Sequence, residues 1–146
     1  MMQVLAIDDS FTLRKLVRAI LEPAGYEVIE AADGVEGLLA LHASEGPLVV
    51  LLDYQMPNMD GMGVLQAVIA EGGALLAHDY IVVSANHATF PENFIELLRH
   101  LSIRVLPKPF DREALLTTVA QAVDRLEAPP ELVFPPDTPD ADDENG

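Results

Sequence analysis

Short apolar runs alternate with amphipathic stretches along most of this chain. Five runs are predicted to be β-strands because they are short, apolar or alternating, and bounded by polar or turn residues; they are residues 4–8, 27–31, 48–53, 80–84 and 103–106. Between them, apolar residues recur at helical spacing, as in Leu13, Leu16, Val17, Ile20 and Leu21. Strands alternating with helices in this way predict an α/β fold. The sheet would be parallel and five-stranded, with helices on both faces.

Residues that cap or break helices set the predicted helix limits. Pro23 ends the first helix, and Asp33 caps the second. The third helix, residues 61–71, would turn four apolar side chains toward the core: Val64, Leu65, Val68 and Ile69. Thr89, with Glu92 three residues later, predicts a capping box at the start of the fourth helix. The whole pattern is a (βα)5 doubly wound fold, for which the flavodoxin-like strand order is 2-1-3-4-5.

Composition changes this picture only at the C-terminal end. The chain has 146 residues, half of them hydrophobic, which is enough for one domain with a sizeable core. Residues 1–127 are predicted to form that domain. Residues 128–146 contain six acids and five prolines but no Lys or Arg, so they are predicted to be an acidic, Pro-rich disordered tail.

Charge and missing residue types exclude several classes of function. The net charge of −16 opposes binding to nucleic acid and to anionic membranes. Without cysteine, neither disulfides nor thiolate metal sites can form. No apolar run approaches the about 18 residues of a membrane span, and the first residues lack the basic region of a signal peptide. A cytoplasmic location is therefore the default expectation.

Polar residues that could bind a metal or take part in a reaction lie at the ends of four predicted strands. Asp8 ends the first and Asp9 follows it, Asp53 ends the third, Ser84 ends the fourth, and Lys108 comes just past the fifth. Because parallel strands end at the same edge of a sheet, these side chains are expected to converge. Three converging carboxylates repel one another, and a hard divalent cation would relieve that repulsion. Magnesium suits such a site best, and the absence of a neighbouring histidine argues against zinc.

Each of these residues also has an ordinary structural interpretation. An isolated Asp8-Asp9 pair is usually a turn with a helix cap, and Asp53 alone could be an Asx-turn residue before Pro57. A lone lysine is usually on the surface, although Lys108 lies between two prolines that restrain its backbone. The combination, and no single residue, indicates a functional site.

Four short motifs, in this order and spacing, resemble the receiver domain of two-component response regulators, nearest to the stand-alone, chemotaxis-type receivers. They are Asp8-Asp9-Ser10, Asp53 with Met56-Pro57-Asn58-Met59-Asp60-Gly61, Ser84-Ala85 and Lys108-Pro109-Phe110. The resemblance covers about residues 3–127. It implies a phospho-accepting signalling module and not an enzyme, beyond self-phosphorylation and autodephosphorylation.

The resemblance also implies a role for each site residue. Asp53 would accept a phosphoryl group from the phosphohistidine of a histidine kinase or histidine phosphotransfer protein. Asp9 would ligate Mg²⁺ directly, Asp8 would help through water, and the backbone carbonyl of Gln55 would be a further ligand, beside Asp53 itself. Lys108 and the Ser84 hydroxyl would bind the phosphoryl group, and the Lys108–Pro109 bond would be cis. Residues 85–89 would then shift and present the surface of the fourth helix, fifth strand and fifth helix to an output protein.

Some positions keep other interpretations open. Val105 stands where receivers commonly carry Tyr or Phe, so a receiver-like module that binds partners independently of phosphorylation remains an alternative. An aspartyl-phosphate phosphatase of the haloacid-dehalogenase type would resemble Asp-x-Asp, but Gln55 stands where the second acid is needed. A flavin-binding flavodoxin is disfavoured, because the acid trio would repel the flavin phosphate.

Overall fold

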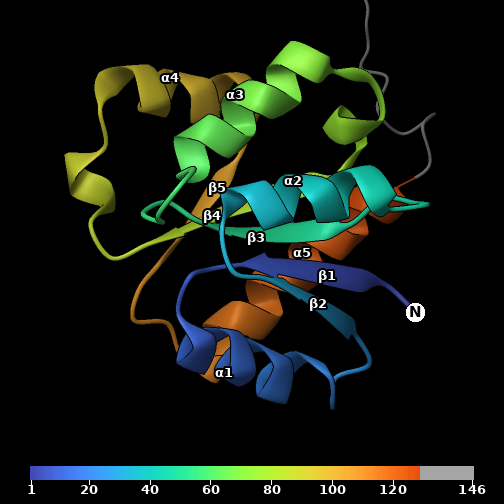
Figure 1. Cartoon of the computed structure of the whole chain (residues 1–146). Coiled ribbons are helices and arrows are strands. Elements are labelled where there is room, and N and C mark those ends of the chain that lie inside the picture. Colours follow the sequence, from blue (N-terminus) through green and yellow to red (C-terminus); the bar gives the residue numbers. More distant parts are fainter. Residues whose placement is uncertain (129–146) are drawn as a thin grey trace, which may run out of the picture.

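The computed structural model describes residues 1–128, and their strands form one parallel sheet in the order β2-β1-β3-β4-β5 (Figure 1). The α/β fold and the strand order predicted from the sequence are therefore confirmed. The strands are β1 Gln3–Ile7, β2 Glu27–Ala31, β3 Val49–Asp53, β4 Asp79–Ser84 and β5 Arg104–Pro107. In register, Asp53 of β3 lies beside Val83 of β4, so the two strands end together at one edge of the sheet.

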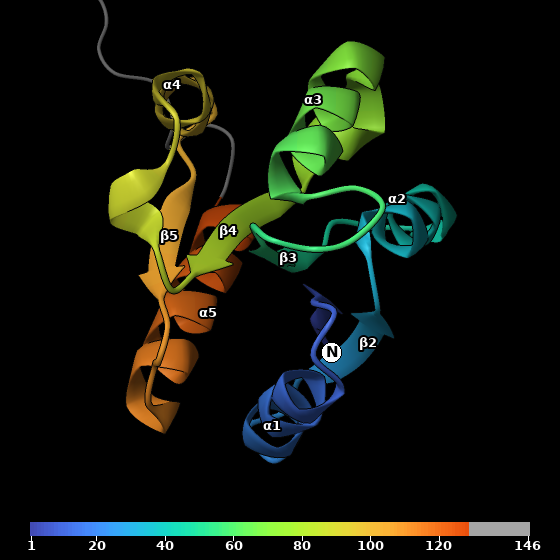
Figure 2. The same ribbon diagram turned by 60° about the vertical axis from the view of Figure 1, so that its left-hand side comes forward.

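Five α-helices cover the two faces of the sheet. They are α1 Phe11–Leu21, α2 Gly34–Ala43, α3 Gly61–Glu71, α4 Glu92–His100 and α5 Arg112–Glu127, and two short 3₁₀ helices, η1 Gly73–Ala77 and η2 His87–Thr89, lie in the connections around β4. Figure 2 shows α1 and α5 on one side of the sheet and α2, α3 and α4 on the other. Both faces are therefore buried, which explains why the strands read as nearly continuous apolar runs.

The central strands divide their side chains between two cores. In β3, Val49 and Leu51 point toward α1 and α5, whereas Val50 and Leu52 point toward the opposite layer. This alternation follows from the two-residue period of a strand. It leaves the polar residue that ends the strand, Asp53, at the carboxyl edge of the sheet.

Three details of the sequence prediction are wrong. Leu16 and Ile69, assigned to the core faces of α1 and α3, are 45% and 40% exposed, because each lies at the border of its helix's apolar stripe. Thr89 does not cap α4. Its hydroxyl donates to the Asn86 carbonyl within η2, and α4 begins after Pro91 without a side-chain cap. The predicted capping box is absent because Thr89 belongs to η2 and Glu92 is the first residue of the helix, not the fourth position of a box.

The predicted tail, residues 128–146, lies outside the described residues except for Ala128. Within residues 1–128, no helix combines the length and the apolar character needed to cross a membrane.

Candidate functional site

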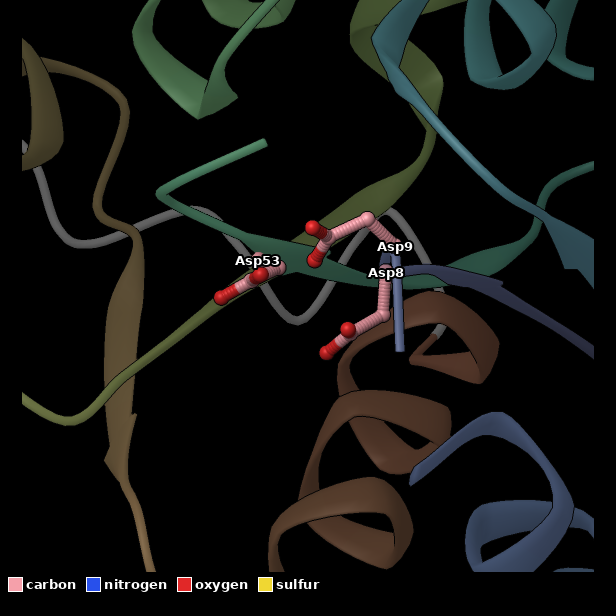
Figure 3. A group of neighbouring side chains, drawn as sticks. All are labelled: Asp8, Asp9 and Asp53. Carbon is pink, nitrogen blue, oxygen red and sulfur yellow. The ribbon is translucent and has the colours of Figure 1, made fainter. Parts of the chain in front are cut away.

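Three carboxylates converge at the carboxyl edge of the sheet. Asp8 and Asp9 follow β1, Asp53 ends β3, and one oxygen from each lies within 4.8 Å of those of the other two (Figure 3). Asp8 and Asp53 are buried, whereas Asp9 is exposed. The residues that the sequence predicted to meet at this edge are therefore brought together.

Lys108 supplies the positive charge among these acids. Its Nζ lies 3.2 Å from an oxygen of Asp8 and 3.2 Å from an oxygen of Asp53. Burial alone would lower the pKa of Lys108, but the two carboxylates outweigh that effect and raise it. Its backbone is held as well, because Lys108 N–H donates to the Ser84 carbonyl at 2.9 Å. The bond to Pro109 is cis, as the resemblance implied. The ammonium therefore stays charged between the two buried acids.

One lysine does not balance three acids. Burial, followed by repulsion from Asp8, raises the pKa of Asp53 to about 6, although Lys108 opposes both effects. The atoms that could ligate a metal here are hard carboxylate oxygens, and they are held at the ends of strands. Such a set fits Mg²⁺, which binds through a few carboxylates and keeps several waters. Asp8, Asp9 and Asp53 are thus the described residues that fit a divalent cation.

Local hydrogen bonds hold the loops that carry the acids. Ser10 caps α1 by accepting the Leu13 N–H, and its own N–H donates to Asp8 Oδ1 at 2.8 Å. On the β3 side, Gly61 N–H donates to the Tyr54 carbonyl at 2.8 Å. A Cβ at Gly61 would lie 2.8 Å from the Asp53 carbonyl oxygen, so the loop after Asp53 closes this tightly only with glycine there.

Ser84 and Gln55 lie at the same edge. Ser84 is buried at the end of β4, and its Oγ accepts the Asn86 N–H at 3.1 Å, which leaves the hydroxyl hydrogen free to donate elsewhere. Gln55 lies in the loop two residues after Asp53, with an exposed side chain. Its role through the backbone carbonyl stays a prediction.

Two sets of residues around the site were missed by the sequence analysis. Arg14 of α1 donates to the Asp8 carbonyl at 2.6 Å. Tyr54, directly after the candidate acceptor, packs its ring against Phe90 and Phe94 at centroid distances of 4.8 and 4.7 Å. The spacing of Phe90 and Phe94, one helical turn apart, favours packing on the core, and both are buried. Their contact with Tyr54 joins distant segments and leaves no pattern in the sequence.

Comparisons with known proteins show which sequences and folds the chain is similar to. Protein PilG from Pseudomonas aeruginosa is 30% identical over 118 residues, covering 81% of this chain and 84% of PilG. The solved structure of the chemotaxis protein CheY4 from Vibrio cholerae is similar, with 30% identity, a TM-score of 0.71, and coverage of 84% of this chain and 98% of that one. A CheY-like receiver domain protein from Methanospirillum hungatei gives a TM-score of 0.74 at 28% identity, covering 85% and 95%.

Other relatives are longer than this chain. The probable transcriptional regulator ycf27 from Cyanophora paradoxa is 42% identical over 64 residues, which are 44% of this chain and 26% of that regulator. The match therefore spans about a quarter of the regulator's length. The family model for the response regulator receiver domain matches residues 4–120, which include every candidate site residue. The chain belongs to the response regulator receiver domain family of two-component signalling.

Proposed function

We propose that Asp53 accepts a phosphoryl group from a phosphohistidine of a histidine kinase or phosphotransfer protein, in a Mg²⁺-dependent step that switches binding to an output partner. The observation that carries this proposal is the position of Lys108 Nζ, 3.2 Å from both Asp53 and Asp8 within the acid cluster. An ammonium there can pair with an oxygen of a group attached to Asp53. If Lys108 served only to stabilise the fold, one carboxylate partner would be enough, and the negative charges of the other two acids would have no purpose.

The chemistry requires an ionised acceptor. With a pKa of about 6, the Asp53 carboxylate is ionised at neutral pH. One of its oxygens forms a bond to phosphorus while the P–N bond of the phosphohistidine breaks and its electron pair passes to the imidazole. Catalysis of such a transfer consists mostly of positioning and charge neutralisation. Lys108 provides both, because it is fixed beside the carboxylate and stays charged.

The cation requirement follows from the excess of acids. Asp8, Asp9, Asp53 and the Gln55 carbonyl would hold Mg²⁺. When bound, the ion supplies the positive charge that offsets the carboxylates and the phosphoryl oxygens. The Ser84 hydroxyl lies on the neighbouring strand end, and we infer that it donates to a phosphoryl oxygen while Oγ still accepts from Asn86. Each of these groups would therefore help to stabilise the negative charge of the phosphoryl group, either by holding the cation or by donating a hydrogen bond.

The switch must pass from Asp53 to the output face without an aromatic residue at position 105. Tyr54 offers a route in this chain, because it is covalently next to Asp53 and packs against Phe90 and Phe94. Phe90 follows η2, and Phe94 lies buried in the first turns of α4. The rings of Tyr54, Phe90 and Phe94 form a cluster that packs against α4. A displacement of residues 84–89 toward a phosphoryl group would therefore shift this ring cluster and, with it, α4.

Partners are proposed by surface. The output protein would bind the face formed by α4, β5 and α5, where Val105 is half-buried on the edge strand. A module that binds its partners independently of phosphorylation is the competing function, and Val105 is the feature that favours it. The cytoplasmic location and the absence of nucleic-acid and membrane partners remain predictions from the sequence.

The proposal is tested by intact mass after incubation with acetyl phosphate. Wild type with Mg²⁺ is expected to gain about 80 Da, one metaphosphate unit. The gain should be lost with EDTA and in Asp53→Ala, whereas Asp60→Ala, which removes a carboxylate from the same loop, should keep it. Wild type without added mass, or modification that persists in Asp53→Ala, would favour the phosphorylation-independent module.

A further inference from the structure

Arg14 makes two directional hydrogen bonds that link the outer strand β2 to the acid cluster. Its side chain is only 12% exposed, and it lies in the first turns of α1. Nη1 donates to the Asp8 carbonyl at 2.6 Å, and Nε donates to Glu30 of β2 at 3.0 Å. A part-buried guanidinium can satisfy its fork of donors only when such partners are fixed, so this arrangement is specific to arginine.

Glu30 is a firm anchor for that link. Its side chain is 13% exposed, and Lys15 and Arg18 also donate to it, each at 2.8 Å. Partial burial by itself would raise the pKa of Glu30, but the hydrogen bonds from Lys15, Arg18 and Arg14 lower it to about 2. Glu30 therefore stays ionised at neutral pH and holds Arg14 from the edge strand.

The bond to the Asp8 carbonyl fixes the peptide between the two site acids. The Asp8 N–H already donates to the carbonyl of Ala31, next to Glu30, at 3.0 Å. Arg14 secures the other side of Asp8, at the peptide that begins Asp9. Asp9 is exposed, so packing restrains its side chain little, and its backbone sets the direction of the Cα–Cβ bond from which the carboxylate extends. The orientation of this peptide therefore contributes to whether the Asp9 carboxylate can reach toward Asp53.

We propose that Arg14 is a positioning residue of the cation site: through the Asp8 carbonyl and Glu30 it holds the Asp8–Asp9 peptide in the orientation that makes the three carboxylates converge. It acts through the acids and does not itself contact the phosphoryl group. This inference rests on the proposed function, since it concerns the same cation. Cation affinity would then depend on Arg14, a residue that is neither one of the acids nor the site lysine.

The matched pair Arg14→Met and Arg18→Met tests this role. Both changes remove one positive charge and one hydrogen bond to Glu30, but only the first removes the bond to the Asp8 carbonyl. Partners that orient metal ligands typically contribute 10- to 100-fold to affinity, so we expect Arg14→Met to weaken binding of Mg²⁺ about tenfold in calorimetry at fixed ionic strength. Arg18→Met should stay within about twofold of wild type, since it contacts no site atom.

The sign of the effect separates positioning from charge. Removing the positive charge of Arg14 would also remove its repulsion of Mg²⁺, so electrostatics alone would strengthen Mg²⁺ binding. Tighter or unchanged binding in Arg14→Met would therefore overturn the inference. A second readout needs no metal: exchange of the Ser10 amide, which donates to Asp8 Oδ1, should accelerate in Arg14→Met and not in Arg18→Met. Equal exchange in the two variants would also contradict it.

The measurement on wild type distinguishes failure of the proposed function from failure of the role of Arg14. If wild type itself binds no Mg²⁺, the proposed function fails. If wild type binds the ion and both variants bind it equally, only the role of Arg14 fails. Should Arg14→Met not fold, Arg14→Lys against Arg18→Lys makes the same comparison, because one ammonium cannot reproduce the guanidinium fork; a loss of at least about threefold is then expected for Arg14→Lys alone.

Discussion

Replacing Asp53 by Asn should stabilise the metal-free protein. Asp53 is only 7% exposed and lies beside Asp8, and together burial and that repulsion raise its pKa from 3.8 to about 6. At 1.36 kcal/mol per unit, ionised Asp53 costs the folded state about 3 kcal/mol. Asparagine keeps the shape and removes the charge, but its new amide donor needs a partner, which offsets about 1 kcal/mol. A net gain of about 2 kcal/mol should raise Tm by roughly 5–10 °C.

The size of this effect depends on pH. Below pH 3.8 Asp53 is protonated in both the folded and the unfolded chain, so the substitution changes little. Between about pH 4 and about 6 the unfolded chain loses its proton before the folded one, so the stability of wild type falls as pH rises. Above about 6 the folded carboxylate is ionised too, and the full difference from Asp53→Asn should be present.

Thermal melts in EDTA from pH 4.5 to 8 measure this difference. Asp124→Asn, at an exposed position of α5, is the matched control and should follow wild type throughout. Mg²⁺ should then raise the Tm of wild type by linkage, and raise that of Asp53→Asn less. If Asp53→Asn melts at or below wild type at pH 7.5, and the difference does not change with pH, the electrostatic account of the site is refuted.

Three further changes test other parts of the structure. Glu30→Gln should destabilise by about 1–2 kcal/mol above pH 5, and the difference should shrink as pH falls toward 2, because the pKa of Glu30 is lowered; a constant difference in urea melts would contradict this. Phe94→Ala should cost about 3–5 kcal/mol in the same assay, since Phe94 is fully buried, whereas exposed Phe11→Ala should cost little. Tyr54→Leu, but not Tyr26→Leu, should reduce by at least about half the chemical-shift changes in α4 after acetyl phosphate and Mg²⁺; equal responses would exclude the ring cluster as the route.

Topology made the convergence of the site predictable. Asp8 and Lys108 are 100 residues apart in sequence, yet their contact follows from one inference, that parallel strands end at a common edge. That inference needed only apolar runs of strand length alternating with helical periodicity. No knowledge of side-chain packing entered, so errors at Leu16 and Ile69 did not affect it.

Contacts that depend on packing were not predictable in the same way. The helical period assigns a face, but it does not fix how far the neighbouring elements cover that face, so the border residues Leu16 and Ile69 were misplaced. The bond from Arg14 to Asp8 requires the rotation of α1 against β2 to be known. Sequence shows an arginine four residues after Ser10, which many surface helices share.

The strain in the acid cluster also explains why the site is built on strand ends. Three carboxylates held within 4.8 Å would separate if their loops were free, because ionised Asp53 is already disfavoured beside Asp8. Here β1 and β3 are central, hydrogen-bonded strands whose ends cannot move apart without breaking the sheet. The repulsion therefore remains in the metal-free protein, and a bound cation would relieve it. The same repulsion that lowers stability is thus what makes the edge of the sheet selective for positive charge.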